Sequence, residues 1–207
     1  MGRDAVKEKI NVVALTAAHL DDIVVVHLRA FPGFFLSSLG PRFLREFYAA
    51  FLVDGGAVAL VAENEHGLVC GAVVGSISPE GFFRRLLMRR WWAFLYASMD
   101  AVLRNPAVSA RLIRAVWYRG DAPGDQDRAL LSSIAVDPAK QGTGIGKQLI
   151  KGWLAEVRKR GCPGSYLTTD ATHNDATNAF YCINGWKLES CYETREGRKM
   201  NRYVFDW

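Results

Sequence analysis

Three glycines lie close together in the run Gln141-Gly142-Thr143-Gly144-Ile145-Gly146. The residues before this run predict a buried strand over 129–136 that ends at Asp137-Pro138, and those after it predict an amphipathic helix over 146–160. Glycines at the start of a helix let the backbone come close to a ligand, and the amide groups there lie at the positive end of the helix dipole. The loop is therefore predicted to bind an anionic group.

The spacing of this loop excludes two common phosphate-binding motifs. A P-loop requires a Ser or Thr directly after its Gly-Lys pair, and Gln148 occupies that position. A dinucleotide-binding fingerprint requires a third glycine where this chain has Lys147. The loop instead satisfies the pattern Q/R-x-x-G-x-G through Gln141, Gly144 and Gly146.

A second segment that could carry chemistry begins at Asn174. Asn174 and Tyr181 are seven residues apart on a predicted helix over 174–183, so they share one face of that helix after about two turns. The segment has the form N-x6-Y-x3-G-[FW] and ends at Gly185-Trp186. On the residue types alone, Asn174 also suits a helix cap, and an isolated tyrosine at this position is more often a core residue of an amphipathic helix than an acid. The presence of the glycine loop upstream favours the functional interpretation of both residues.

The loop and this second segment together resemble the GNAT acetyltransferase family, and the resemblance covers residues 130–186. It implies that the loop binds the pyrophosphate of acetyl-coenzyme A and that the preceding strand bonds the pantetheine arm through its backbone. It also implies that Tyr181 is the catalytic acid near the thioester sulfur. The cofactor-binding residues implied by the resemblance are Ile134, Ala135, Val136, Gln141, Gly142, Thr143, Gly144, Ile145, Gly146, Lys147, Asn174 and Tyr181.

The reaction implied is N-acetylation of a primary amine by direct attack on acetyl-coenzyme A in a ternary complex. A backbone amide of the 129–136 strand, that of Ile134 first, would polarise the thioester carbonyl. The general base stays open, because the strand residues Leu130-Leu131-Ser132-Ser133 offer no carboxylate. Asp170 and His173 are candidates, although each is also an ordinary loop or cap residue. An alternative of another class is a coenzyme A binding regulatory or interaction module without turnover.

The acceptor is expected beside the early helices. Phe31, Phe34 and Phe35, with Asp170 and His173, are the predicted substrate-binding residues. The run over 27–44 resembles acetyltransferases of surface-polysaccharide pathways, which act on nucleotide-linked amino sugars. A small-molecule amine, with a nucleotide-linked amino sugar as one choice, is therefore the expected acceptor, and no metal is expected at the site.

Positive charge is concentrated between Gly81 and Arg119, where eight arginines accompany one acid, Asp100, although the whole chain carries a net charge of only +5. This favours a local anionic contact and argues against nucleic acid as a partner. The segment also predicts a helix with an apolar stripe at Phe83, Leu87, Trp91, Phe94 and Leu95. The stripe covers the core or a homodimer partner, or it docks the protein peripherally on an anionic membrane.

These segments are expected to form one α/β domain over residues 1–207, with a helical basic and aromatic insertion at about 78–127. The early part predicts a strand over 10–15, helices over 19–31 and 37–52, and a hairpin of strands over 57–62 and 68–77. After residue 129 the alternation of elements predicts a right-handed parallel crossover to a strand over 165–169, followed by strands over 185–192 and 199–205.

The expected fold is thus a GNAT-type mixed central sheet, with antiparallel flanks, a parallel pair at the cofactor cleft and helices on both faces. The charged start of the chain predicts neither a signal peptide nor a membrane span. Four cysteines without a C-x-x-C pair predict a reducing, cytoplasmic location.

Overall fold

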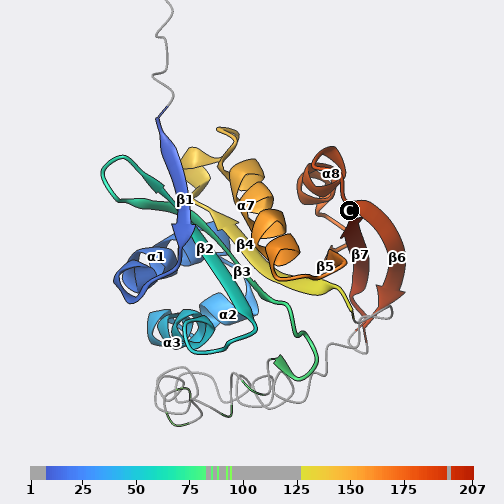
Figure 1. Ribbon diagram of the computed structural model, residues 1–207, viewed down its shortest axis with the longest axis horizontal. Coiled ribbons are helices and arrows are strands. Elements are labelled where there is room, and N and C mark those ends of the chain that lie inside the picture. Colours follow the sequence, from blue (N-terminus) through green and yellow to red (C-terminus); the bar gives the residue numbers. More distant parts are fainter. Residues whose placement is uncertain are drawn as a thin grey trace, which may run out of the picture.

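The computed structural model describes residues 8–82, 127–194 and 197–207, together with Arg85, Met88, Trp92 and Phe94. Within this part of the chain a seven-stranded sheet has the order β1-β2-β3-β4-β5-β7-β6 (Figure 1). The strands are β1 (Ile10–Ala14), β2 (Ala57–Asn64), β3 (Val69–Ser76), β4 (Ala129–Val136), β5 (Gly164–Asp170), β6 (Lys187–Glu193) and β7 (Lys199–Asp206). Among the described strands only β4 and β5 are parallel neighbours, which confirms the predicted mixed sheet.

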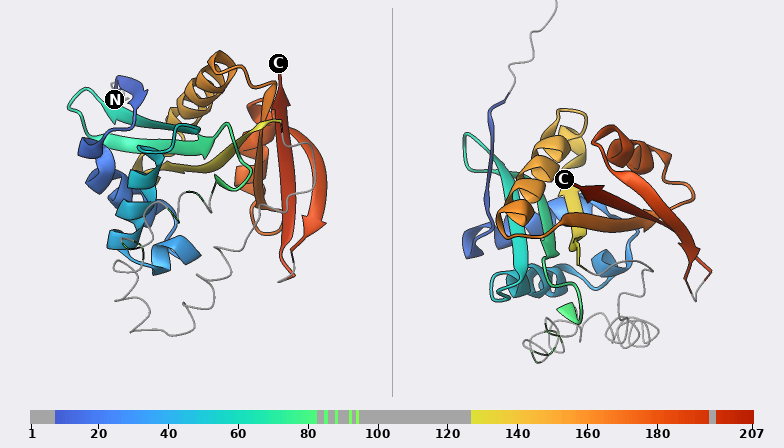
Figure 2. Two further views of the ribbon diagram at one scale, coloured as in Figure 1. Left: turned by 60° about the horizontal axis from the view of Figure 1, so that its bottom comes forward. Right: turned by 45° about the vertical axis from the view of Figure 1, so that its right-hand side comes forward.

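Helices cover both faces of the sheet (Figure 2). The helices α1 (Leu20–Ala30), α2 (Phe35–Ser38) and α3 (Pro41–Phe51) pack on one face, and α7 (Ile145–Lys159) and α8 (Asp175–Ile183) pack on the other. Two short 3-10 helices, η1 (Ala17–His19) and η2 (Pro138–Lys140), follow β1 and β4. The sheet therefore separates two apolar clusters, one under α1 and α3 and one under α7 and α8.

The single helix predicted over 37–52 is wrong, because the structure divides this region into α2 and α3. Gly40 has a φ of 88°, a left-handed conformation that an α-helix cannot contain, and Pro41 occupies the first position of α3. Phe43, Phe47 and Phe51 are buried along one face of α3, as their spacing predicts. The apolar period was therefore interpreted correctly, but the Gly-Pro break within it was missed.

A close approach between α7 and the sheet fixes the position of the central strands. A Cβ at Gly75 of β3 would lie 2.0 Å from the Leu130 carbonyl oxygen and 2.5 Å from the Trp153 ring, so only glycine fits there. The buried Trp153 indole donates a hydrogen bond to Ser165 Oγ on β5 (3.0 Å), and Ser165 donates to the Ala129 carbonyl of β4 (2.9 Å). Helix α7 is thus tied to both members of the parallel pair.

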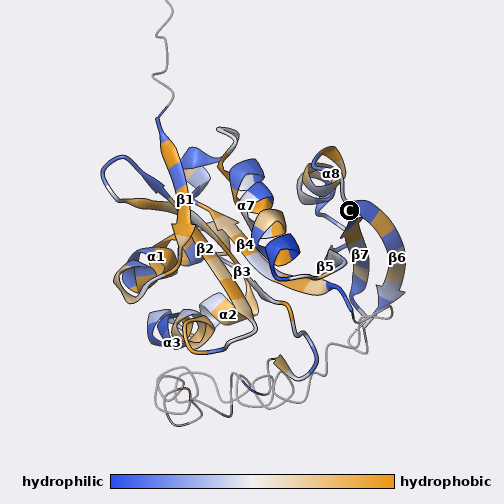
Figure 3. Ribbon diagram, viewed as in Figure 1, coloured by the Kyte–Doolittle hydropathy of each residue, from blue (hydrophilic) through white to orange (hydrophobic). Residues whose placement is uncertain are grey.

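Polarity follows this architecture. Every residue of β3 is buried, whereas most residues of the edge strand β6 are exposed. Colouring by hydropathy shows the same contrast between the apolar centre of the sheet and the alternating polarity of β6 and β7 (Figure 3). Among the described helices, none is long and apolar enough to cross a bilayer.

The predicted basic and aromatic insertion at about 78–127 lies mostly outside the described residues. Of the predicted apolar stripe only Phe94 is described; it is buried, and its ring centroid lies 5.0 Å from that of Phe43 on α3. Trp92, two residues before it, is 68% exposed. At Phe94, therefore, the stripe packs against the core of the domain.

Candidate active site

The parallel pair opens into a fork. β4 and β5 pair only at Ala129 with Ser165 and at Leu130 with Tyr166. Beyond these residues β4 continues along β3 as far as Val136, and its other edge pairs with no described strand (Figure 1). This open edge exposes backbone groups of β4 to a ligand.

A β-bulge lies at the start of the open edge. The register with β3 steps from Gly75–Leu131 to Val74–Ser133, so Ser132 is an extra residue in β4. The bulge turns the side chains of the following residues, with the result that Ala135 packs in the cluster under α1 and α3, whereas Ile134 packs in the cluster under α7.

Backbone amides of β4 point into the fork at two positions. The Asp137 amide donates to the Cys70 carbonyl of β3 (2.9 Å), and successive amides of a strand alternate between its two edges. The Ile134 and Val136 amides therefore point to the open edge, and the Ala135 amide points to β3. The Val136 carbonyl also faces the opening, where the Gln141 side chain donates to it (3.4 Å).

The glycine loop connects this edge to α7. The Asp137 carboxylate accepts a hydrogen bond from the Ala139 amide (2.9 Å) and starts the η2 turn, while the Thr143 hydroxyl donates to the Lys140 carbonyl (2.6 Å). Gly142 and Gly144 have φ values of 78° and 90°, which L side chains rarely adopt, and nothing lies within 4 Å of a Cβ built at either position. The loop is thus held in a left-handed conformation and remains open on its outer side.

Unpaired amides converge at the start of α7. Gly144 is the N-cap, and the first hydrogen bond of the helix runs from the Gln148 amide to the Gly144 carbonyl (3.1 Å). The amides of Ile145, Gly146 and Lys147 precede it and have no acceptor within the helix. Together with the helix dipole and the exposed Lys147 side chain they form a site that suits a diphosphate. These residues fit the pyrophosphate of a coenzyme A thioester.

Lys140 is a further cation at the loop, and it pairs with Glu8. The hydrogen bond between them is the largest cause that raises the Lys140 pKa and lowers the Glu8 pKa. Because both side chains are partly exposed, salt screens this pair, and we assign it a minor role.

Tyr181 lies inside the helix-covered end of the fork. It is 5% exposed and is surrounded by the rings of Phe180, Trp186 and Tyr203, at centroid distances of 5.5, 6.0 and 5.8 Å. Burial raises the pKa of its phenol, so the proton stays on the oxygen throughout the neutral range. No described residue accepts a hydrogen bond from this hydroxyl, which keeps the proton available to a ligand.

Asn174 bonds to β5 instead of capping α8. Its Nδ2 donates to Thr169 Oγ1 (2.7 Å) and to the Asp170 carbonyl (3.2 Å), and its side chain makes no hydrogen bond to the first turn of the helix. Asn174 therefore lies at the junction between β5 and α8, at the same end of the fork as the loop.

Asn178 is a structural residue of the site that the sequence analysis missed. Its Oδ1 accepts hydrogen bonds from Asn201 Nδ2 (3.1 Å) and the Tyr203 hydroxyl (3.0 Å) of β7. Its Nδ2 donates to the carbonyls of Asp170 (3.1 Å) and Asn174 (2.9 Å). The three bonds to Asp170, Asn201 and Tyr203 fix α8, and so Tyr181, against β5 and β7. The signal was a polar residue on the inner face of an amphipathic helix.

The two candidate bases differ in surroundings. Asp170 accepts three hydrogen bonds from Arg198, one from Nε to Oδ1 (3.2 Å) and one from Nη2 to each carboxylate oxygen (2.8 Å), so its charge is already paired. His173 is exposed in the loop before α8 and has a positive φ of 55°. Among the described residues, neither side chain makes a hydrogen bond or an ion pair with β4.

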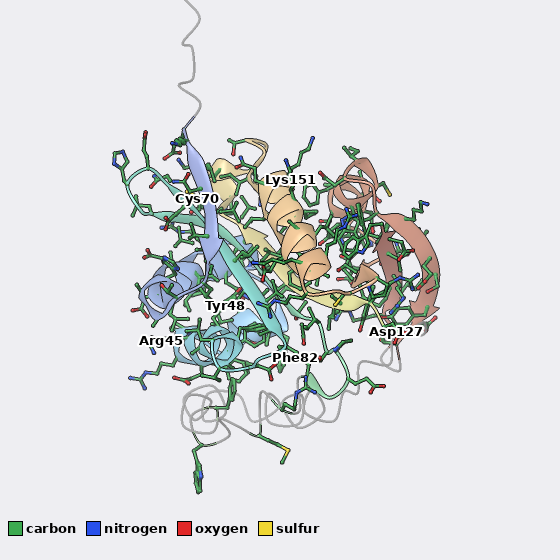
Figure 4. The ribbon with its side chains drawn as sticks, in the orientation of Figure 1. Arg45, Tyr48, Cys70, Phe82, Asp127 and Lys151 are labelled. Atoms are coloured by element: carbon green, nitrogen blue, oxygen red, sulfur yellow. The ribbon has the colours of Figure 1, made fainter. Side chains whose placement is uncertain are left out.

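Of the predicted substrate-binding residues, Phe31, Phe34 and Phe35 lie at the end of α1 and the start of α2, on the opposite face of the sheet from α7, whereas Asp170 and His173 lie between β5 and α8. The Phe31 ring contacts His27 and Phe34, at centroid distances of 4.9 and 5.0 Å, and Phe34 is 53% exposed. Phe35, the first residue of α2, is half-buried. The buried His27 and Tyr48 form a hydrogen-bonded pair that the sequence analysis did not identify. Tyr48 lies in the interior between α3 and the sheet (Figure 4).

Solved structures show the same fold at low sequence identity. A GNAT-family acetyltransferase of Desulfovibrio desulfuricans is 16% identical, with a TM-score of 0.64 over 96% of this chain and 99% of that one. The ribosomal-protein-S18-alanine N-acetyltransferase of Escherichia coli is 15% identical, with a TM-score of 0.57 over 96% and 94%. A GNAT acetyltransferase of Brucella melitensis, in complex with acetyl-CoA, is 18% identical, with a TM-score of 0.54 over 97% and 89%. No curated protein matches the sequence significantly.

The fold and the site define an acyl-coenzyme A dependent N-acyltransferase. The model of the Acetyltransferase (GNAT) family matches residues 21–186, which is most of the chain. The chain belongs to this family.

Proposed function

We propose that this protein transfers the acetyl group of acetyl-coenzyme A to a primary amine of a small molecule. The observation that carries the proposal is the joint position of two sets of free backbone amides, those at the start of α7 and those of Ile134 and Val136 on the open edge of β4. The first set suits a diphosphate, and the second suits an extended amide-containing arm.

The residues then have distinct roles. The α7 amides, the loop 141–146 and Lys147 hold the pyrophosphate, while Val136 and Asn174 bond the pantetheine arm. Bound acetyl-coenzyme A supplies the thioester that is consumed. The Ile134 amide donates to the thioester carbonyl oxygen and stabilises the charge that develops there. Tyr181 Oη provides the proton that the sulfur takes as it leaves.

The acceptor that we propose is a nucleotide-linked amino sugar. Two observations support it: the resemblance of residues 27–44 to acetyltransferases that use such acceptors, and the aromatic residues Phe31 and Phe34 at the end of α1, which offer stacking surfaces for a sugar or base. Arg29 and Arg45 lie in the same helical layer, where they pair with Asp137 and Asp21, and a diphosphate would have to replace these carboxylates.

A panel of amines tests this proposal. Purified protein is incubated with acetyl-coenzyme A and nucleotide amino sugars, free amino sugars, polyamines or peptides with free N-termini, and the products are identified by mass spectrometry. We expect acetylation of a nucleotide amino sugar in preference to the free sugar. Acetylation of peptides alone would contradict the proposal that the acceptor is a nucleotide amino sugar. Tight binding of acetyl-coenzyme A with no acetylated product from any amine would favour the alternative of a coenzyme A binding regulatory module.

A further inference from the structure

A buried polar pair lies beneath β4, on the face of the sheet opposite α7. His27 on α1 and Tyr48 on α3 are 2% and 1% exposed, and His27 Nδ1 lies 2.7 Å from the Tyr48 hydroxyl oxygen. Ser133 lies two residues before Ala135 and therefore on the same face of β4, which packs under α1 and α3 where Tyr48 is buried. Burial raises the Tyr48 pKa, and a hydrogen bond with the Ser133 side chain opposes that rise. The three side chains therefore connect α1 and α3 to the open strand of the fork.

The direction of the hydrogen bond follows from its length and from the charge of the ring. Burial lowers the His27 pKa to about 4, so the imidazole is neutral at physiological pH and carries one N–H. A separation of 2.7 Å is typical of a hydroxyl donor, since N–H donors usually lie at about 2.9–3.0 Å. Tyr48 thus donates to Nδ1. The N–H is then on Nε2, which has no hydrogen-bond partner among the described residues. The imidazole ring packs edge-on against the Phe31 ring, at a centroid distance of 4.9 Å.

This direction determines what Ser133 can do. Because the Tyr48 hydroxyl uses its one hydrogen in the bond to His27, its oxygen can only accept a further hydrogen bond, so the neighbouring Ser133 hydroxyl donates toward Tyr48. The lone pairs of Ser133 then remain available to another donor. Ser133 is half-buried, is the first residue after the bulge, and directly precedes Ile134, whose amide points into the fork.

We propose that Ser133, oriented by Tyr48 and His27, accepts a hydrogen bond from the acceptor amine and so positions its nitrogen for attack on the thioester. This inference rests on the proposed function. Ser133 is the residue that contacts the substrate, and Tyr48 and His27 are positioning residues. As the N–C bond forms and the C–S bond breaks, the Tyr181 proton goes to sulfur, and the proton lost from nitrogen returns through water to Tyr181.

His27 and Tyr48 orient the amine through Ser133 and do not accept the proton that the amine loses. An imidazole buried in this way stays neutral at the pH where an amine attacks, and only burial contributes to its altered pKa. The amine must therefore arrive neutral. A neutral amine needs no general base to deprotonate it before attack. The reaction is therefore compatible with a β4 strand that has no carboxylate and with an Asp170 that is paired with Arg198.

Removal of single hydroxyl groups tests the inference. Ser133→Ala and Tyr48→Phe are each expected to lower kcat about tenfold on the amine identified in the panel, with KM and the dissociation constant of acetyl-coenzyme A nearly unchanged. The double variant is expected to be no slower than Ser133→Ala, because the hydroxyls act as one unit. Ser133→Thr keeps a hydroxyl and should recover most of kcat. Tyr166→Phe, which removes a buried phenol oxygen from β5, is the matched control and should leave kcat unchanged.

The pH profile separates positioning from base catalysis. We expect the pH profiles of kcat/KM for the wild type, Ser133→Ala and Tyr48→Phe to be parallel. In each profile the midpoint of the rising limb should lie at the pKa of the acceptor amine. A limb that moves in Tyr48→Phe would identify the pair as a proton acceptor and overturn the inference, as would full activity of Ser133→Ala in an active wild-type background. A wild type that binds acetyl-coenzyme A but acetylates no amine would overturn the proposed function itself, and this inference with it.

Discussion

The Phe180 ring of α8 lies over Gly146 in the first turn of α7, such that a Cβ at Gly146 would be 3.0 Å from Phe180 Cζ. Gly146 therefore has a packing role that the loop pattern alone does not reveal. It allows α8, which carries Tyr181, to pack against the helix whose amides are to hold the pyrophosphate.

Substitution of Gly146 by Ala is expected to weaken acetyl-coenzyme A binding about tenfold, because the new methyl group displaces Phe180 at a cost of about 1–3 kcal/mol. Isothermal titration calorimetry measures the change. Gly152→Ala is the matched control: it lies on the same helix, its Cβ would meet Val12 Cγ1 at the same 3.0 Å, and it is remote from the loop. Equal affinities of the two variants would contradict the role of the contact between Gly146 and Phe180.

Tyr181→Phe is expected to lower kcat about 100-fold and to leave acetyl-coenzyme A affinity nearly intact, because the phenol provides a proton and makes no hydrogen bond to the described protein. Steady-state kinetics and calorimetry check the two quantities. In the control Tyr203→Phe, the lost hydroxyl is one that bonds Asn178. The melting temperature of this variant should therefore fall, whereas its kcat should fall much less than that of Tyr181→Phe. A parallel loss of affinity and kcat in Tyr181→Phe would assign Tyr181 to binding.

Much of the fold was predictable because local patterns and packing agree. Strand β4 was predicted with its bounds correct, since a continuous apolar run is followed by Asp137-Pro138, and α7 was predicted to within one residue because glycines mark its start. The break between α2 and α3 was missed because the apolar period continues across Gly40-Pro41.

The inner polar residues could not be predicted in the same way. His27 and Tyr48 lie in segments whose apolar period predicts core helices, and their hydrogen bond joins residues that are 21 positions apart on different helices. The bulge at Ser132 depends on the register with β3, which a single strand sequence does not contain. Long-range pairing of this kind is decided by tertiary structure.

Asp170→Asn is expected to leave kcat within about twofold of the wild type and to cost at most about 1 kcal/mol of stability, because Asp170 forms a partly exposed ion pair with Arg198. Kinetics over a range of pH and urea unfolding provide the measurements. Arg198→Gln removes the other partner and should give a similar loss of stability. A large fall in kcat for Asp170→Asn alone, with loss of the rising pH limb, would restore Asp170 as the general base.

The stability of the fold should fall as the pH falls from about 6.5 toward 4, because of His27. Burial lowers the His27 pKa from 6.5 to about 4, so the folded state resists a proton that the unfolded chain accepts. The contribution of neutral His27 to the free energy of unfolding is complete above the pKa of His27 in the unfolded chain, and it is lost as the pH falls toward the His27 pKa in the folded state. Between pH 7 and pH 5 it amounts to about 2 kcal/mol by linkage.

The variant His27→Gln isolates this effect, because it keeps a side chain that can accept a hydrogen bond from Tyr48 but removes the titration. Urea unfolding at the two pH values should show a loss for the wild type that exceeds the loss for His27→Gln by about 2 kcal/mol, since the carboxylates and the other histidines contribute equally to both proteins. Identical losses would mean that His27 keeps an ordinary pKa in the folded state, and the ring could then be charged near pH 6 and donate to Tyr48, which reverses the direction of the hydrogen bonds toward Ser133.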